Sequence, residues 1–553
     1  MSPPGTFARN VSDDVLDRFY STPILSGTLA FPGQTHESAL ATLEVLRDDF
    51  KTYHVFVNNI GFHNHASHHV LALYALGASP ELIKEAYYGL HVPNLLPSLV
   101  SPERITEENF TEHLGDERYY DGYLAFFTEY LQKNSPTGAL ERFIFSPAYN
   151  FTPGLETGGD DLKKHPRMLD RLLAGLLHPF IHVAYGLEFG ILGQVAEGLA
   201  QTAVHSAAQI EIIPPSYFNK SPTDNISGFL STFTSTLSLD VDHNHVPPPE
   251  KKRPMFAFHR RIRDDPEFKL RDLPNQPGQR YLTVVKQSGG AIHSLVREWT
   301  EEWLVGTRSE AEAEIRLKSM VEEVIWGNVI WCSVGGWASR GDSARVTNAD
   351  FFLAHLVTSA IFLPKLIIKE EALSPSPPPF GRAGALLSFG NRLLLLQTYL
   401  AACAGWQISR GNNPLPITDF YAATDEQLQL SGSPRARSQV RAGSARSVSS
   451  LGPSSNPWTY IIPSAIQARE EHTPKMMRSL ANFAVRWGMC APGYFGSDNE
   501  NGNDDDDGRR SLEGIERLDG TLFVRVAGLT LDRLGWVHEG EEFGRWDRDG
   551  SPN

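Results

Sequence analysis

The sequence predicts a mainly α-helical protein, a large bundle-like fold built as a single unit. Apolar residues at helical spacing dominate the 553 residues, and few stretches alternate as strands do. Helix punctuation agrees, since Gly77 closes one apolar segment and Ser79-Pro80 opens the next as a cap followed by a first helical residue. We therefore expect helices over residues 36–49, 65–77, 80–88, 120–132, 138–146, 166–177, 179–200, 291–305, 308–324, 348–369, 384–406 and 462–487.

We interpret residues 1–553 as one catalytic domain that is interrupted by loop insertions. Residues 371–382 are rich in proline, which favours extended chain over helix. Residues 430–456 are rich in Ser, Arg and Gly, and residues 497–510 carry an acidic block. Both contain too few large apolar side chains to offset the entropy of ordering, so we predict that they are mobile loops.

Composition narrows the class of protein. The net charge of −15 argues against a nucleic-acid partner, because binding phosphate needs a concentrated basic face. The N-terminus lacks an apolar signal core, and the best candidate for a membrane span, residues 351–368, is interrupted by charges and a proline. Three cysteines without a CxxC pair exclude a disulfide framework and a thiolate zinc site: Cys332, Cys403 and Cys490. We expect an intracellular, cytoplasmic protein with no membrane partner; the oligomeric state is not indicated.

Four histidines crowd the start of one expected helix, in "HNHASHH" at residues 63–69. Taking Asn64 as the N-cap places His65 in the first turn and His69 one turn later on the same face. Such a concentration of imidazole suggests proton transfer or metal binding. We expect the other two, His63 and His68, to be surface residues at the cap.

A second pair, His178 and His182, stands four residues apart in the apolar stretch "HPFIHVAYGLEFG", and His355 is alone in another apolar helix. The pair could share one metal ion or be a buried structural pair, whereas a core histidine is the simpler reading of His355 taken alone. Ligands from facing helices converge in helical bundles, and nitrogen ligands without thiolate suit iron, zinc, copper or nickel. Glu188 is either a carboxylate that orients a ligating imidazole or a capping or ion-paired glutamate. The second "HNH", residues 243–245, is expected in an exposed loop.

Several common catalytic motifs are missing from the sequence. We find no GxGxxG, which lowers the expectation of a bound dinucleotide, and no Walker A, GxSxG or HExxH motif.

The segments "HNHASHHVLALYALGA", "HPFIHVAYGLEFG", "DFFLAHLVTSAIFLP" and "GWVHEGEEFGRWD" together resemble the questin oxidase-like family of fungal secondary metabolism. The resemblance implies oxidative ring opening of anthraquinones and related aromatic polyketides. Some members are described as Baeyer–Villiger oxidases that use reduced nicotinamide. A close relative is understood as a non-haem iron dioxygenase, in which four histidines and a carboxylated lysine hold the iron.

Carried over to this sequence, the resemblance implies metal ligands at His65, His178 and His355, with His182 as the fourth and His69 and His293 in reserve. The lysine is a departure, because "NRLLLLQTYLAACAG" contains none where the family pattern places it. Gln397 occupies that region, and Lys365 is a weaker candidate for the carboxylated residue.

The function expected from the resemblance is an Fe(II)-dependent dioxygenase that uses O2 to cleave a C–C bond in the ring of a hydroxyanthraquinone-type substrate. In this reading His69, Tyr185 or Arg410 holds or deprotonates the substrate phenol, with no choice made among the three, and Glu188 orients a ligand. The alternative is an NADPH-dependent Baeyer–Villiger-type monooxygenase acting on the same substrates. A helical protein that binds the polyketide without chemistry is the reading outside enzymology.

Overall fold

The computed structural model describes residues 9, 11–24, 30–57, 62–158, 161–218, 254–270, 272–341, 346–369, 386–430, 456–496 and 512–549. Four predictions lie outside these residues. They are the expected insertions at 371–382, 430–456 (apart from its two end residues) and 497–510, and the expected loop at 243–245. Their mobility and exposure stay predictions.

The described residues are helical, which confirms the predicted fold class. Pairing of extended chain within them is limited to isolated bridges between Tyr53 and Pro97, Phe56 and His63, and Asp350 and Asp547. By its internal contacts the chain divides into a first unit (residues 1–248, 274–322 and 362–405) and a second unit (residues 249–273, 323–361 and 406–553). The interpretation as one domain stays a prediction.

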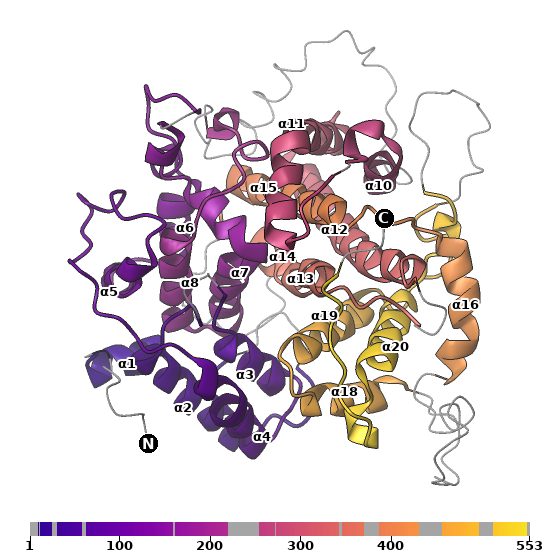
Figure 1. The fold of residues 1–553 in the computed structure, drawn as a ribbon, viewed down its shortest axis with the longest axis horizontal. Coiled ribbons are helices and arrows are strands. Elements are labelled where there is room, and N and C mark those ends of the chain that lie inside the picture. Colours follow the sequence, from indigo (N-terminus) through magenta and orange to yellow (C-terminus); the bar gives the residue numbers. More distant parts are fainter. Residues whose placement is uncertain are drawn as a thin grey trace. The chain divides into compact units, whose positions relative to one another are not determined.

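The following helices lie entirely in the first unit (Figure 1). They are α1 (Asp13–Phe19), α2 (His36–Thr52), α3 (Ala66–Ala75), α4 (Pro80–Lys84), α5 (Tyr120–Leu131), α6 (Pro136–Leu140), α7 (Met168–Phe189), α8 (Leu192–Val204), α11 (Pro277–Leu304) and α14 (Leu363–Ile367). Two π-helical turns follow α4 and α6, at Glu85–His91 and Glu141–Phe145.

Helices α12 (Glu310–Ala338) and α15 (Phe389–Ser409) carry residues of both units. The second unit adds α10 (Pro254–Asp264), α13 (Phe351–Ala360), α16 (Ile417–Leu430), α18 (Trp458–Gln467), α19 (His472–Trp487) and α20 (Leu522–Leu534). Short 3₁₀ turns lie at Val92–Asn94, Glu117–Tyr119, Pro147–Tyr149, Asp161–Lys164, Pro215–Phe218, Pro266–Phe268, Ile515–Arg517 and Val537–Glu539.

The predicted punctuation around Ser79 is confirmed, and so is the expected irregularity at Pro179, which was predicted to open a new helix or to kink a longer one. The Ser79 hydroxyl accepts a hydrogen bond from the backbone N–H of Leu82 at 3.4 Å, and α4 begins at Pro80. Helix α7 as a whole extends from Met168 to Phe189. Its C-cap is Gly190, whose φ of 72° is left-handed. The chain leaves the helical conformation earlier, over residues 174–177, so Pro179 stands near the start of a renewed helix, where its missing N–H costs nothing.

Helices α7 and α8 pack closely because glycines replace side chains where they meet (Figure 1). A Cβ on Gly186 would lie 2.6 Å from the backbone nitrogen of Val195, and one on Gly198 would lie 2.5 Å from that of Val183. Both neighbours are backbone atoms that cannot rotate away. This approach fixes the helix that carries His178 and His182 against its partner.

Helix α7 is also the one helix among the described residues that is long and apolar enough, by length and composition, to cross a membrane. Of its apolar window, 89% is buried inside the structure. It is therefore a core helix of the first unit.

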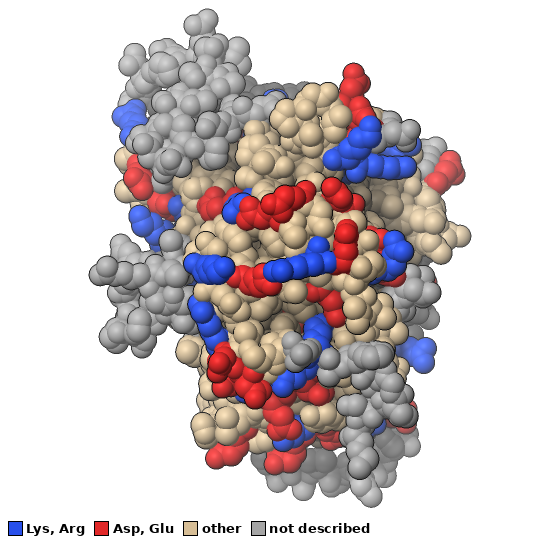
Figure 2. Space-filling model, turned by 90° about the vertical axis from the view of Figure 1, so that its left-hand side faces the viewer, with Lys and Arg blue, Asp and Glu red and all other residues tan. Residues whose placement is uncertain are grey.

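Charges of both signs are mixed on the face shown in Figure 2. Lysine and arginine side chains alternate there with aspartate and glutamate, and the described part of this face carries no continuous basic patch.

We predict that Gly198→Ala lowers the free energy of unfolding by about 1–3 kcal/mol, because the added methyl group forces α8 away from α7. Gly290→Ala on α11 is the matched control, since nothing lies within 4 Å of the added Cβ. It should raise stability by about 0.5–1 kcal/mol through helix propensity. Denaturant unfolding of both variants measures the difference, and equal effects would contradict the close packing.

Candidate metal centre

The turn before α3 presents the first histidines of the site. Helix α3 has His65, not Asn64, as its N-cap, because the His65 carbonyl accepts the first helical hydrogen bond, from the N–H of His69 at 2.9 Å. The Asn64 side chain does cap locally, since its Oδ1 accepts from the N–H of Ala66 at 2.9 Å. The expected cap is therefore shifted by one residue.

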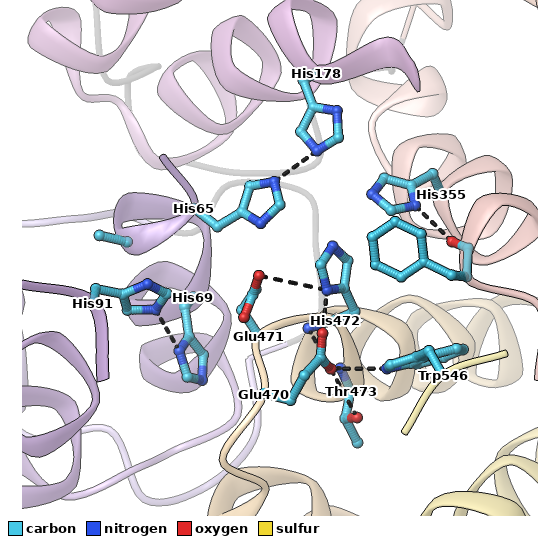
Figure 3. A network of polar contacts seen from close by, with 12 residues as sticks. His65, His69, His91, His178, His355, Glu470, Glu471, His472, Thr473 and Trp546 are labelled. Carbon is cyan, nitrogen blue, oxygen red and sulfur yellow. Dashed lines mark hydrogen bonds and ion pairs between the residues drawn. The ribbon is translucent and has the colours of Figure 1, made fainter. Parts of the chain in front are cut away.

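His65 and His178 face each other through their ring nitrogens (Figure 3). The two Nε2 atoms lie 2.6 Å apart. His178 donates from Nδ1 to the carbonyl oxygen of Gly175 at 2.6 Å, which leaves the lone pair of the neutral ring on Nε2. Two imidazole nitrogens this close need either one shared proton or a cation between them.

His63 joins this pair, contrary to the expectation that it is a surface cap residue. Its ring stacks on that of His178, with centroids 4.1 Å apart and planes 9° from parallel. One ligand atom from each of His63, His65 and His178 lies within 4.8 Å of the other two. Three imidazoles with ligand atoms this close suit a divalent transition metal, so the residues fit the iron that the resemblance implies.

A left-handed turn inside α7 sets the direction of His178. Gly175, Leu176 and Leu177 have φ values of 55°, 59° and 65°. A leucine in this conformation costs about 1–2 kcal/mol, because its Cβ approaches the following carbonyl oxygen. Backbone strain of this kind clusters at functional sites, and here it directly precedes a candidate ligand.

His182 lies with a different set of partners. Its Nδ1 is 3.1 Å from Nε2 of His68, and its Nε2 is 3.7 Å from a carboxylate oxygen of Glu197. His68 is fully buried, so the prediction of a surface role for it is wrong; it packs between the His182 and Tyr185 rings, stacked on Tyr185 at 5.0 Å. The role of His182 as a metal ligand stays a prediction, and the structure groups His63 with His65 and His178 in its place.

Two buried carboxyl groups, those of Asp49 and Glu197, contact the segments that carry the histidines. Asn64 donates to both carboxylate oxygens of Asp49, at 2.9 and 3.2 Å. Glu197 accepts from the hydroxyl of Tyr20 at 2.8 Å. Burial, and then the charge of Glu197, raise the pKa of Asp49 to about 8, so Asp49 holds a proton at neutral pH.

The other predicted catalytic residues are buried in the same unit. His69 pairs with His91 through Nδ1 and Nε2 at 2.9 Å (Figure 3), and Tyr185 packs edge-on against Phe362. Glu188 is 1% exposed. The reserve residue His293 contacts Tyr217, and burial lowers its pKa. The grouping of three ligand atoms does not include any of these residues, and their roles stay predictions.

In the second unit, His355 is a buried residue of α13 whose orientation is set by its own helix. Its Nδ1 donates to the carbonyl of Phe351 at 2.8 Å, which again leaves the lone pair on Nε2. Asp350 caps the helix by accepting from the N–H groups of Phe352 and Leu353 at 2.8 and 2.9 Å. The guanidinium of Arg410 neutralises this buried cap, with Nε 2.9 Å from the carboxylate. As His355 belongs to the second unit, its joining His65 and His178 stays a prediction.

His472, which the sequence reasoning missed, lies beside His355 with ring centroids 4.8 Å apart. Its Nδ1 contacts the carboxylate of Glu470, which also accepts from Trp546 Nε1 at 2.8 Å (Figure 3). The signal was in the sequence: "EEHTPK" sets a histidine directly after two glutamates within the expected helix 462–487.

A buried lysine, Lys475, follows His472 by one turn of α19 and was also missed. It is 3% exposed, and burial lowers its pKa to about 8. Of the two candidates named from the sequence, Gln397 donates to the hydroxyl of Thr300 at 3.0 Å, and Lys365 is only half-buried.

Buried imidazoles whose second nitrogen is held by a carbonyl or carboxylate define a helical protein with a candidate metal centre. The chain belongs to the questin oxidase-like family, whose model matches residues 62–480; the resemblance is confirmed.

Three fungal relatives illustrate the similarity. The Baeyer-Villiger oxidase ptaJ of Pestalotiopsis fici is 32% identical over 175 residues, which are 31% of this chain and 36% of the relative. The oxidoreductase AflY of Aspergillus parasiticus is 25% identical over 355 residues, 62% of this chain and 61% of the relative. The questin oxidase of Aspergillus fumigatus is 29% identical over 175 residues, 31% and 36% of the two chains. The chain thus spans less than two thirds of each of these relatives.

We predict that Asp49→Asn flattens the dependence of stability on pH. A carboxyl pKa raised to about 8 means that the folded protein keeps a proton that the unfolded chain loses above about pH 4. This contribution is present below pH 4 and is lost as the pH rises to 8, by up to about 1.4 kcal/mol per pH unit. Denaturant unfolding at pH 5 and pH 8 measures the loss, which asparagine should abolish and which the exposed control Asp14→Asn should leave unchanged.

Proposed function

We propose that the chain is a non-haem iron oxygenase that uses O2 to cleave a C–C bond in the ring of a hydroxyanthraquinone-type aromatic polyketide. The observation that carries the proposal is the group of His63, His65 and His178, with a neutral imidazole nitrogen of His178 facing His65 at 2.6 Å. Family membership and the names of the relatives support the oxidase chemistry and the substrate class.

In this proposal His65 and His178 hold the ferrous ion, and His63 is a third ligand. When bound, the ion supplies a coordination position where O2 and a phenolate-type substrate can exchange electrons. The protein sets the state of His178 in two ways. The Gly175 carbonyl fixes the tautomer of the ring, and the left-handed turn fixes the direction in which the ring points.

In the proposal, other histidine, tyrosine and glutamate residues of the first unit bind the substrate or transfer its protons. Tyr185 and His69 are the proposed groups that hold or deprotonate the phenol, with Tyr185 stacked on His68. His68 in turn lies against His65, with ring centroids 5.8 Å apart. Glu188 is kept as the proposed carboxylate that orients a ligand.

We also propose that Lys475, a buried lysine of the second unit, forms a carbamate with CO2. A carbamate forms when the lone pair of a neutral amine attacks the carbon of CO2, a C–O π pair moves to oxygen, and a proton leaves the nitrogen. Burial favours the neutral amine of Lys475 by lowering its pKa to about 8. Lys365 and Gln397 offer no comparable feature.

The relatives named Baeyer-Villiger oxidases favour one alternative, an NADPH-dependent monooxygenase acting on the same substrates. Activity of the metal-free protein that depends on NADPH would support it. Activity that disappears on chelation and returns with ferrous ion supports the dioxygenase.

We predict that anaerobically reconstituted protein binds about one equivalent of iron, and that His65→Ala and His178→Ala each reduce it more than tenfold while the helical circular dichroism is retained. His355→Ala tests whether the second unit supplies a ligand. His182→Ala tests the two interpretations of His182. If His182 is a metal ligand, the variant protein loses iron; if His182 only packs beside Glu197, the variant keeps its iron. His36→Ala, at an exposed helix start, is the control; iron content unchanged in His178→Ala would overturn the site.

We predict that protein equilibrated with ¹³C-bicarbonate shows a carbamate resonance that is absent from Lys475→Met and present in Lys365→Met. The buried neutral amine is the reason for the difference. Carbon-13 NMR measures it. A carbamate signal that survives Lys475→Met would assign the modification elsewhere.

A further inference from the structure

Gly175 packs its backbone directly on the imidazole of His205. A Cβ added to Gly175 would overlap Nε2 of His205. His205 donates from Nδ1 to the carbonyl of Ser206 at 3.1 Å, so the ring is held with Nε2 toward the glycine. The lack of a side chain at position 175 is therefore a steric requirement as well as a conformational one.

The His205 ring continues the stack of imidazoles. It lies parallel to His63, with centroids 5.3 Å apart and planes 10° from parallel, and His63 stacks in turn on His178. The His178 ring returns to the glycine by donating from Nδ1 to the Gly175 carbonyl. Four residues thus form a closed circuit of contacts.

The backbone that carries His205 is clamped to the first turns of α7. Arg171 donates from Nη1 to the His205 carbonyl and from Nε to the carbonyl of Pro166, the latter at 2.7 Å. The carboxylate of Asp170 accepts from the N–H of Ala208 at 3.0 Å. These bonds hold the carbonyl of residue 205 and the backbone that follows it, so the backbone that carries the ring is fixed beside Gly175.

We propose that Gly175 and His205 are positioning residues for His178: their contact maintains the left-handed turn that aims Nε2 of His178 at His65. The inference rests on the proposed iron site for its consequence, but its geometry belongs to the protein alone. Neither residue touches the reacting atoms; both act through the His178 ring.

The test begins with the affinity for ferrous ion, measured by anaerobic competition with a chelator. Gly175→Ala should weaken binding by about 10–100-fold, the effect typical of losing a group that orients a metal ligand. Gly154→Ala is the matched control, because Gly154 also has a left-handed φ, of 83°, but nothing lies within 4 Å of the added Cβ. It should leave the affinity unchanged.

A double-mutant cycle isolates the contact. His205→Ala removes the ring that the new methyl group would meet, so in that background Gly175→Ala should cost little more than Gly154→Ala does. If Gly175→Ala costs as much with alanine at 205 as with histidine, the left-handed backbone alone matters and the contact is not the positioning element. The double variant also keeps the test open if Gly175→Ala by itself fails to fold.

A readout without metal separates this inference from the iron proposal. In ¹⁵N-histidine-labelled apoprotein, the Nδ1–H proton of His178, assigned with His178→Ala, should be shifted downfield by its bond to Gly175 and should lose that shift in Gly175→Ala. Retention of the shift would overturn the inference even if iron binds. Wild-type protein that binds no ferrous ion but shows the expected change would overturn the iron site and leave the positioning role standing.

Discussion

The hydrogen bond from His178 Nδ1 to the carbonyl of Gly175 is the constraint on which the candidate site depends. The residue four positions later, whose N–H an α-helix would use for that carbonyl, is Pro179, which has no N–H, so the carbonyl accepts from the His178 ring instead. This carbonyl then fixes the tautomer of the histidine that follows. The strain in two leucines is local, and the close contact of α7 with α8 fixes the part of the helix that follows the turn.

The same arrangement occurs at two histidines of the second unit, built from different parts. His355 uses the carbonyl one turn earlier in α13, and His472 uses the carboxylate of Glu470. At His178 and His355 the bond to a carbonyl leaves the lone pair on the second nitrogen, Nε2. A histidine that only fills the core does not need one particular nitrogen as the donor, because any pairing of donors and acceptors satisfies it. A metal ligand does, because the nitrogen that faces the metal must carry the lone pair.

How much the sequence could predict follows from which signals are local. The 63–69 cluster and the His178/His182 spacing identified the segments, and periodicity identified most of the long helices. The spacing alone could not show that His178 and His182 have different partners. A separation of four residues places both rings on one face of the helix, but it does not indicate which residue of α8 or α3 each ring contacts. The buried position of His68 depends on tertiary contacts with His182 and Tyr185.

Pro179 signalled an interruption between the expected helices 166–177 and 179–200, but nothing in "GLL" indicated that the chain turns left-handed there. Leucine at positive φ is adopted only where the surroundings enforce it, and here they consist of a clamped His205 on one side and the stack of His63 and His178 on the other. The turn that orients the ligand thus depends on His63 and His205, which are distant in the sequence, as well as on His178 itself. A site of this kind becomes visible only when the packing around it is known, although each of its histidines was already visible in the sequence.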